Sequence, residues 1–308
     1  MRKVFAIIVI YNGMKNDWIQ KCFDSILNSS VSCEIVAIDN HSSDDSVQFI
    51  KSNYKEVSLI ESDINLGFGG ANNKGLEEAL RKGGEYFLLL NQDAQVSEDT
   101  IEVLIEQAQN NPEYGIISPM HLNGRGDALD FNFSVQIEPK RCKQLYSDIF
   151  LKKDLNKLYE AKFICAACWL LPKSTLKLVG GFNPTFFHYG EDDNYCHRII
   201  YHKLKIGVYP CSNIFHDRED RAASKYDDNF EMLKRQYLRE LSDPNTARIN
   251  ERKQVLMSKK IIYAVLRNES QVQLIDYKLQ LIKNGYMRQA LEHRAVSQSS
   301  TAFNFLAY

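Results

Sequence analysis

Small and polar residues follow each of four short apolar runs in the first half of the chain. They are Tyr11-Asn12, the stretch 39–44 (DNHSSD), the glycine-rich stretch 65–75 (NLGFGGANNKG) and the stretch 91–94 (NQDA). Carboxylates and amides bind divalent cations or hydrogen-bond to nucleobases, and glycines let a ligand approach the backbone closely. Ligands of an open α/β sheet bind at the carboxyl ends of its strands, so these stretches predict one ligand site.

A further acidic group, Glu191-Asp192-Asp193, begins an expected helix over 191–202. It follows an aromatic run, 186–190, that could line a sugar-binding site. Carboxylates at a helix start are also ordinary, because they interact favourably with the helix dipole. The acids therefore indicate either a catalytic cluster or a common helix start.

The elements that would position these residues alternate between strand and helix. Apolar runs predict strands at Val4–Ile10, Glu34–Ile38, Val57–Ile60 and Tyr86–Leu90. Helical spacing predicts helices after Asp17, after Ser43, over Ala71–Arg81 and from Ser97 to Pro112. This alternation predicts a parallel α/β sheet covered by helices on both faces.

The second half of the chain has a different pattern. Residues 121–160 are polar and irregular, a strand is expected at 162–171, a short helix follows Pro172, and 205–209 and 213–216 look extended. Helices are expected over 227–241, 244–268 and 271–293, before a frayed tail of about a dozen residues. We therefore predict a catalytic domain over 1–225, with halves at about 1–120 and 121–225, and a helical region over 226–308.

The motifs together resemble glycosyltransferase family 2, whose members have the GT-A fold, a mostly parallel Rossmann-like sheet. The resemblance runs from IVIYN through AIDNHSSDDS, NLGFGGANNKG and LLLNQDA to GGFNPTFFHYGEDDNYCHRI and NIFHDRED, and so covers about residues 4–220. The NxGFGGANN and NQDA pieces are similar to bacterial rhamnosyl- and galactofuranosyltransferases. A dinucleotide-binding dehydrogenase is not expected, because its glycines would follow the first strand.

The resemblance implies a nucleotide site made by Tyr11, Asn12, Asp39, Asn65, Gly67, Asn73 and Asn91. Asp39 could accept the imide N–H of uracil or thymine, which cytosine lacks, and so favour a UDP- or dTDP-sugar donor. Asn72 stands where many relatives carry Arg, which puts one phosphate or base contact in doubt.

A metal site is also implied. The segment Asn91-Gln92-Asp93 replaces the family's DxD motif and keeps only its last acid. Asp93 could bind Mn²⁺ or Mg²⁺ together with diphosphate oxygens. His216 stands where relatives place a second ligand, and a histidine suits Mn²⁺ better than Mg²⁺.

The family's catalytic pair corresponds to Glu191-Asp192, with Asp192 in the position of the base. Asn194 replaces a further acid of the family pattern. Phe187 and Tyr189 are expected at the acceptor sugar. Trp169 is a third candidate for that contact, although a core position is equally expected for it.

The resemblance implies an inverting glycosyltransferase that transfers a sugar from a UDP- or dTDP-sugar to a glycan or lipid-linked glycan hydroxyl in bacterial surface-polysaccharide synthesis. Two alternatives remain open. One is a nucleotidyltransferase that makes nucleotide sugars, and the other is a catalytically inactive scaffold of a glycan-assembly complex. An intact set of Asp93, Glu191 and Asp192 favours an enzyme over a scaffold.

Composition adds limits on partners and location. A net charge of −1 gives no general attraction to nucleic acid, and the seven scattered cysteines suit a reducing compartment. No signal peptide or membrane-spanning run is recognised. We expect a cytoplasmic protein. The basic amphipathic C-terminal helices either pack on the catalytic domain with solvated faces, touch the inner face of the plasma membrane, or form a homodimer.

Overall fold

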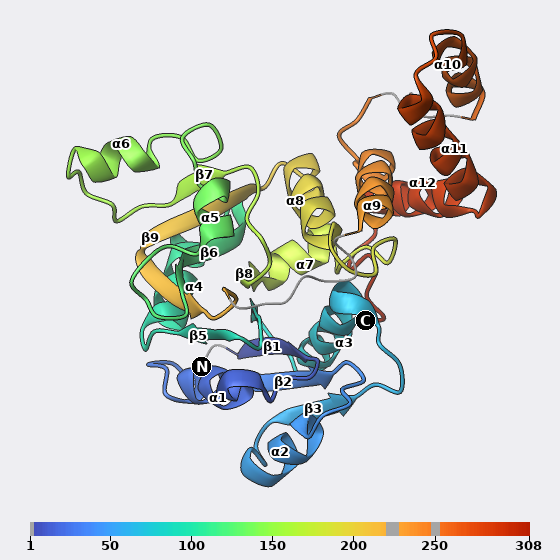
Figure 1. Cartoon of the computed structure of the whole chain (residues 1–308). Coiled ribbons are helices and arrows are strands. Elements are labelled where there is room, and N and C mark those ends of the chain that lie inside the picture. Colours follow the sequence, from blue (N-terminus) through green and yellow to red (C-terminus); the bar gives the residue numbers. More distant parts are fainter. Residues whose placement is uncertain (1–2, 220–227, 248–252) are drawn as a thin grey trace.

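The first strand shows why a sheet forms at the centre of this protein. In the computed structural model, which describes residues 3–219, 228–247 and 253–308, β1 (Val4–Ile10) is almost completely buried. Successive side chains of a strand point to opposite faces, so Phe5 and Ile7 enter one core while Ala6 and Ile8 enter another. Helices cover both faces of the sheet (Figure 1).

The described strands form one mixed sheet in the order β3-β2-β1-β4-β8-β6-β9-β5, with β7 paired to β9. Their bounds are β2 Glu34–Asp39, β3 Ser58–Glu61, β4 Tyr86–Leu90, β5 Ala94–Val96, β6 Tyr114–Asn123, β7 Tyr159–Ala161, β8 Cys168–Pro172 and β9 Lys205–His216. The parallel order β3-β2-β1-β4 confirms the expected α/β arrangement. The second half departs from it, because β8 is antiparallel to both β4 and β6.

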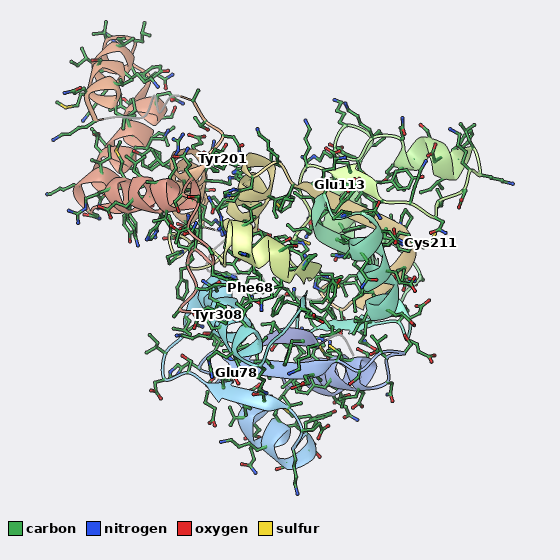
Figure 2. All side chains as sticks on the ribbon, turned by 180° about the vertical axis from the view of Figure 1, so that it is seen from behind. Phe68, Glu78, Glu113, Tyr201, Cys211 and Tyr308 are labelled. Carbon is green, nitrogen blue, oxygen red and sulfur yellow. The ribbon has the colours of Figure 1, made fainter. Side chains whose placement is uncertain are left out.

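The helices divide between the two faces. A 3-10 turn (η1, Lys15–Asp17) leads into α1 (Trp18–Leu27), which packs with α2 (Ser46–Asn53) and α4 (Thr100–Asn110) on the face that holds Ile8. The Phe5 face carries helices α3 Gly67–Arg81, α5 Phe131–Gln136, α6 Leu145–Phe150, α7 Lys173–Val179 and α8 Glu191–Tyr201. Figure 2 shows the same arrangement from behind with all side chains drawn.

Several predicted bounds were wrong. Helix α3 begins at Gly67 and not at Ala71, so the glycine-rich stretch forms the first turn of a helix. The irregular stretch 121–160 contains the end of β6, two short helices and β7, and the strand expected from residue 162 begins only at Cys168. The two extended pieces 205–209 and 213–216 are one strand, β9.

The C-terminal region contains α9 (Asn229–Ser242), α10 (Lys253–Val265), α11 (Glu269–Lys283) and α12 (Tyr286–Ser297). The helix predicted over 271–293 is therefore two helices, separated at Gly285, whose φ of 86° interrupts the first one. Residues 248–252 of the predicted 244–268 helix, and the predicted domain boundary at 225/226, lie outside the described residues. Within the described ranges, no helix is long and apolar enough to cross a membrane.

The chain end is a docked segment, and the expectation of a frayed tail was wrong. The Gly181 N–H donates to the Asn304 carbonyl oxygen at 2.8 Å, and the Ala307 N–H donates to the Glu77 carboxylate at 2.8 Å. The Asn73 amide on α3 donates to the Phe305 carbonyl oxygen at 3.3 Å. These contacts connect the last residues to α3 and to the segment before α8 (Figure 1).

We expect deletion of residues 303–308 to destabilise the protein. It removes at least three hydrogen bonds of about 1 kcal/mol each. For a chain of this size, that corresponds to a loss of melting temperature on the order of 5 °C or more, measurable by calorimetry. An unchanged melting temperature would show that the tail is frayed after all.

Candidate active site

The loops after β1, β2 and β4 are joined by side-chain hydrogen bonds. Asn12 accepts from the Ser43 N–H at 2.8 Å, and the Asn12 N–H donates to the Ser42 hydroxyl at 3.0 Å. Gln92 bonds the Tyr11 backbone in both directions, at 2.9 and 3.0 Å. The predicted strand ends therefore meet at one edge, and Gln92 has a connecting role that the sequence alone did not suggest.

Asp39 presents a buried carboxylate oxygen at this edge. The side chain is 4% exposed, and its Oδ2 accepts from the Ser42 N–H at 3.2 Å. Its Oδ1 is buried and has no hydrogen-bond partner among the described residues. A buried acceptor without a partner is costly unless a ligand supplies the donor, so Asp39 is well suited to an N–H of a bound base. Tyr11, about half exposed, lies in the adjoining loop.

Asn65 and Gly67 shape the start of α3. The Asn65 side-chain oxygen accepts from Asn40 at 3.1 Å and from the Gly67 N–H at 2.9 Å. Gly67 has a φ of 73°, and a Cβ at this position would lie 1.9 Å from the Phe187 carbonyl oxygen. Only glycine allows this close approach. Asn40, which the sequence analysis did not single out, is also buried and donates to Asn65.

Two predicted contact residues lie in the core. The Asn73 side chain accepts from the Phe182 N–H at 2.6 Å and donates to the Phe182 carbonyl oxygen at 2.9 Å. Its polar atoms are thus occupied by backbone groups, and we remove it from the nucleotide site. Trp169 is fully buried and stacks on Phe182 with ring centroids 6.1 Å apart. Without an exposed ring face, it cannot stack on an acceptor sugar in this conformation.

Asp93 and His216 lie together at the carboxyl end of β4. They are brought together because β5 and β9 pair with Ala94 opposite His216. The Asp93 Oδ1 and His216 Nε2 atoms are 3.4 Å apart, and the Asn91 amide nitrogen is also 3.4 Å from Nε2. On the other side of the ring, His216 Nδ1 is 3.5 Å from the Asp130 carboxylate, a residue that the sequence analysis missed.

Two carboxylates flank the His216 ring. Burial lowers the pKa of His216, but the nearby Asp130 and Asp93 carboxylates outweigh burial and hold the pKa above its ordinary value. Burial likewise opposes ionisation of Asp130, yet its bonds with His216 and the Phe133 N–H lower its pKa to about 2. A carboxylate behind a histidine is the usual arrangement that directs the other ring nitrogen toward a metal.

The donor set fits a metal ion that shares its shell with a diphosphate. Two ligand atoms that each lie about 2.1 Å from one ion, in directions at right angles, are about 3 Å apart. The distance between Asp93 Oδ1 and His216 Nε2 is close to this value. The described residues contain no group of three or more His, Cys, Asp or Glu side chains able to hold a metal by themselves. Asp93 and His216 would therefore need donor oxygens and water to complete the shell.

The acidic cluster at the start of α8 has three different environments. Glu191 is 4% exposed, and burial followed by the nearby Asp192 charge raises its pKa well above the ordinary value. Burial followed by Asp193 raises the pKa of Asp192 to about 6. Asp193 pairs with Arg239 of α9 at 3.0 Å. Buried carboxyls with raised pKa values are typical of functional sites.

The segment 165–167 connects the acid cluster to the Asp93 end of the site. The backbone of Ala166 lowers the pKa of the Asp192 carboxyl, and the Ala167 carbonyl oxygen accepts from the Asn91 N–H at 3.0 Å. Burial and the Asp192 charge raise the pKa of the Cys165 thiol to about 11, whereas the Arg218 charge lowers it. Asp192 therefore borders the same region as Asn91.

The aromatic wall includes a contribution from the C-terminal region. Phe187 and Tyr189 are nearly half exposed, as expected for an acceptor surface. The Arg235 guanidinium of α9 lies 4.9 Å from the Tyr189 ring centroid, and its charge lowers the pKa of Glu191. Nothing in the spacing of Arg235 indicated this position, because it depends on how α9 packs against α8.

Known proteins resemble this chain in sequence. One is the low-salt glycan biosynthesis hexosyltransferase Agl10 of Haloferax volcanii, 28% identical over 218 residues that cover 68% of this chain and 66% of that protein. Another is the N-acetylglucosaminyl-diphospho-decaprenol L-rhamnosyltransferase of Mycobacterium tuberculosis, 22% identical over 177 residues that cover 51% of this chain and 58% of that protein. The alignments thus span about three fifths to two thirds of these relatives.

Solved structures share the fold. GalNAc-T7 with UDP, GalNAc and Mn²⁺ superposes with a TM-score of 0.59 at 15% identity, over 79% of this chain and 51% of that one. The S. aureus TarS 1–349 complex with UDP-GlcNAc superposes with a TM-score of 0.55 at 13% identity, over 96% and 90% of the two chains. The family model for glycosyl transferase family 2 matches residues 5–180, more than half of the sequence, and the chain therefore belongs to this family.

Proposed function

We propose that this protein is a metal-dependent, inverting glycosyltransferase that uses a UDP- or dTDP-sugar and glycosylates a glycan or lipid-linked glycan in surface-polysaccharide synthesis. The observation that carries the proposal is the 3.4 Å approach of the Asp93 carboxylate to the His216 imidazole, beside Asn91, whose N–H donates to the Ala167 carbonyl oxygen of the segment that borders Asp192. One site then contains ligands for a diphosphate-bound cation and a carboxylate for the acceptor. The hexosyl- and rhamnosyltransferase relatives support a sugar of one of these classes.

The donor end of the site is supported by burial and by the relatives. Asp39 offers its buried Oδ1 to an imide N–H, and the structural neighbours contain UDP or UDP-GlcNAc. Asp93 and His216 would hold Mn²⁺ or Mg²⁺, of which Mn²⁺ is present in the GalNAc-T7 structure. A bound cation would offset the charge that develops on the leaving diphosphate.

The acceptor end carries out the proton transfer. The acceptor hydroxyl oxygen forms a bond to the anomeric carbon while the bond from that carbon to the diphosphate oxygen breaks. Asp192 accepts the hydroxyl proton, and the electron pair of the broken bond stays with the diphosphate. A single displacement of this kind inverts the anomeric configuration. Phe187 and Tyr189 offer exposed ring faces on which the acceptor sugar can lie.

The metal assignment is tested first by measuring donor turnover with and without Mn²⁺. We expect Asp93→Asn to lower metal-dependent turnover by on the order of a hundredfold or more, because loss of even an outer-shell partner costs 10–100-fold. Asp154→Asn removes an exposed carboxylate elsewhere and serves as the control. Full metal-dependent turnover of Asp93→Asn would remove Asp93 from the site. A nucleotide-sugar product in place of a glycoside would identify a nucleotidyltransferase.

Base recognition is tested by comparing UDP with CDP in calorimetric titrations. We expect the native protein to prefer UDP, because binding CDP leaves the buried Asp39 oxygen without a donor. Asp39→Asn should reduce this preference by about tenfold or more, the value of a buried hydrogen bond to a charged group. Asp45→Asn, which alters an exposed carboxylate of the same loop, is the matched control. Equal affinity of the native protein for the two nucleotides would be incompatible with this role.

The base is tested by the pH dependence of kcat/KM. A base with a pKa of about 6 is ionised above that pH, so activity should fall as pH decreases through 6. Asp192→Asn should lower kcat by ~10²–10⁴-fold and abolish this acid limb, with donor affinity little changed. Asp193→Asn, whose carboxylate pairs with Arg239, should keep the acid limb but move it to lower pH, because the Asp193 charge raises the pKa of Asp192. If Glu191→Gln is inactive while Asp192→Asn is active, the base is Glu191. If the product keeps the anomeric configuration of the donor, single displacement is refuted.

A further inference from the structure

Helix α10 exposes an apolar surface that no described part of the chain covers. Leu256 is its one buried residue. Large apolar side chains on and just after the helix are 39–77% exposed, and we call them the α10 face: Val255, Met257, Ile261, Ile262, Val265 and Leu266. Figure 1 shows α10 and α11 projecting away from the sheet, at the far end of the helical region.

The spacing of these residues gathers them on one side of the helix. Met257, Ile261 and Val265 follow one another at intervals of four residues, and Ile262 and Leu266 form a neighbouring row. At about 100° per residue, Leu256 points away from this stripe, toward the packed side. The α10 face therefore occupies one side of the helix, with the exposed Ser258 between its two rows.

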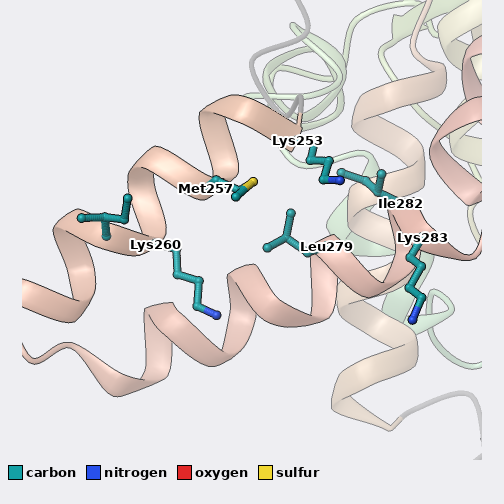
Figure 3. Close-up of a pocket in the computed structure, with 7 residues that line it drawn as sticks. Lys253, Met257, Lys260, Leu279, Ile282 and Lys283 are labelled. Atoms are coloured by element: carbon teal, nitrogen blue, oxygen red, sulfur yellow. The ribbon is translucent and has the colours of Figure 1, made fainter.

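Basic residues border this strip. Lys253 and Lys260 lie on the side toward α11, where they line a groove together with Met257, Ile261, Leu279, Ile282 and Lys283 (Figure 3). Lys259 lies near the opposite border by the same helical spacing. An apolar strip between lysines is the pattern of a helix that lies in a membrane interface.

Charge is unevenly distributed between this region and the rest of the chain. Residues 253–308 contain eight Lys and Arg side chains against three Asp and Glu side chains, a formal net charge of +5, although the whole chain has −1. Two copies facing each other through this region would repel. A surface of negative charge with an apolar interior complements both the apolar α10 face and the basic charge of the surrounding region.

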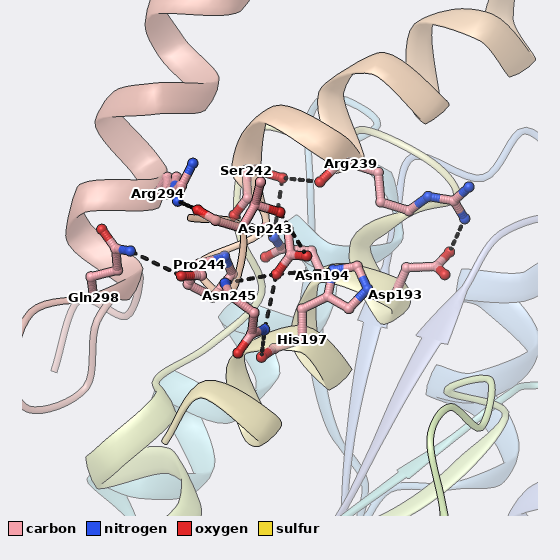
Figure 4. Close-up of polar contacts among 11 residues, drawn as sticks. Asp193, Asn194, His197, Arg239, Ser242, Asp243, Pro244, Asn245, Arg294 and Gln298 are labelled. Atoms are coloured by element: carbon pink, nitrogen blue, oxygen red, sulfur yellow. Dashed lines mark hydrogen bonds and ion pairs between the residues drawn. The ribbon is translucent and has the colours of Figure 1, made fainter. Parts of the chain in front are cut away.

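We propose that the α10 face docks on an anionic lipid bilayer, with its apolar side chains in the interface and Lys253 and Lys259 at the headgroups, while Lys260 stays paired with Asp276 of α11. The helical region can transmit this orientation to the active site, because it is joined to α8 by polar contacts. Arg239 pairs with Asp193, Ser242 accepts from Asn194 at 3.1 Å, and Asn245 donates to the His197 carbonyl oxygen at 2.9 Å (Figure 4). This inference does not depend on the identity of the donor or acceptor.

Flotation of the full chain with lipid vesicles tests the proposal. We expect binding to phosphatidylcholine vesicles in which roughly a third of the lipid is phosphatidylglycerol, and little binding to phosphatidylcholine alone. Binding should weaken as salt screens the surface charge. Two double variants should each reduce partitioning onto these vesicles on the order of tenfold or more: Ile261→Ser with Val265→Ser, and Lys253→Glu with Lys259→Glu. For the lysine variant the reason is that each basic contact contributes roughly fivefold.

Matched variants separate this surface from general properties of the chain. Ile64→Ser changes an apolar side chain that is 64% exposed elsewhere, and Lys55→Glu with Lys162→Glu makes the same charge change at exposed remote positions. Both should bind vesicles like the native protein. Equal binding to neutral and anionic vesicles, or unchanged binding of the α10 variants, would overturn the proposal. The proposal would also be overturned if the native protein formed a dimer in solution and did not bind vesicles, while the Ile261→Ser, Val265→Ser double variant was a monomer. That result would assign the face to a second copy of the chain.

Discussion

The Asn73 amide is the contact that fixes helix α3 against the segment leading into α8. It bonds both the N–H and the carbonyl oxygen of Phe182. The same amide reaches the docked chain end at Phe305. Because Gly67 has no side chain, the Phe187 carbonyl can approach the start of α3. The start of α8 is thereby held against the start of α3, where Glu191 lies beside Gly69.

Some carboxyl oxygens of the candidate site are buried without hydrogen-bond partners in the described part of the chain, which costs folding free energy that a bound ligand can offset. Asp39 Oδ1 and Glu191 Oε2 are buried without hydrogen-bond partners among the described residues, and burial raises the pKa of Glu191 and Asp192. A core optimised for stability alone would avoid such groups. Such unpartnered carboxyl groups fit the proposed ligand site better than a purely structural role.

The C-terminal helices are structurally part of the catalytic unit. Arg235 lies over Tyr189 of the aromatic wall, and Arg239 pairs with Asp193 beside the proposed base. The chain end packs against Gly181. The packed elements α9 and α12 therefore connect the acceptor side of the site to the exposed α10–α11 hairpin, so the orientation of the hairpin is linked to that of the site.

Local pattern was sufficient to predict the strand–helix alternation and the polar strand ends, because burial period and strand-end position are encoded over short distances. The roles of Asp39, Asp93 and Asp192 follow from the resemblance to the family and stay predictions. Local pattern could not predict that β8 enters antiparallel between β4 and β6, since strand direction is decided by pairing between distant segments. For the same reason, Asn73 and Trp169 look like ligand contacts in sequence but are buried by Phe182. The roles of Asp130, Arg235 and the docked tail also depend on long-range packing, which only the tertiary structure decides.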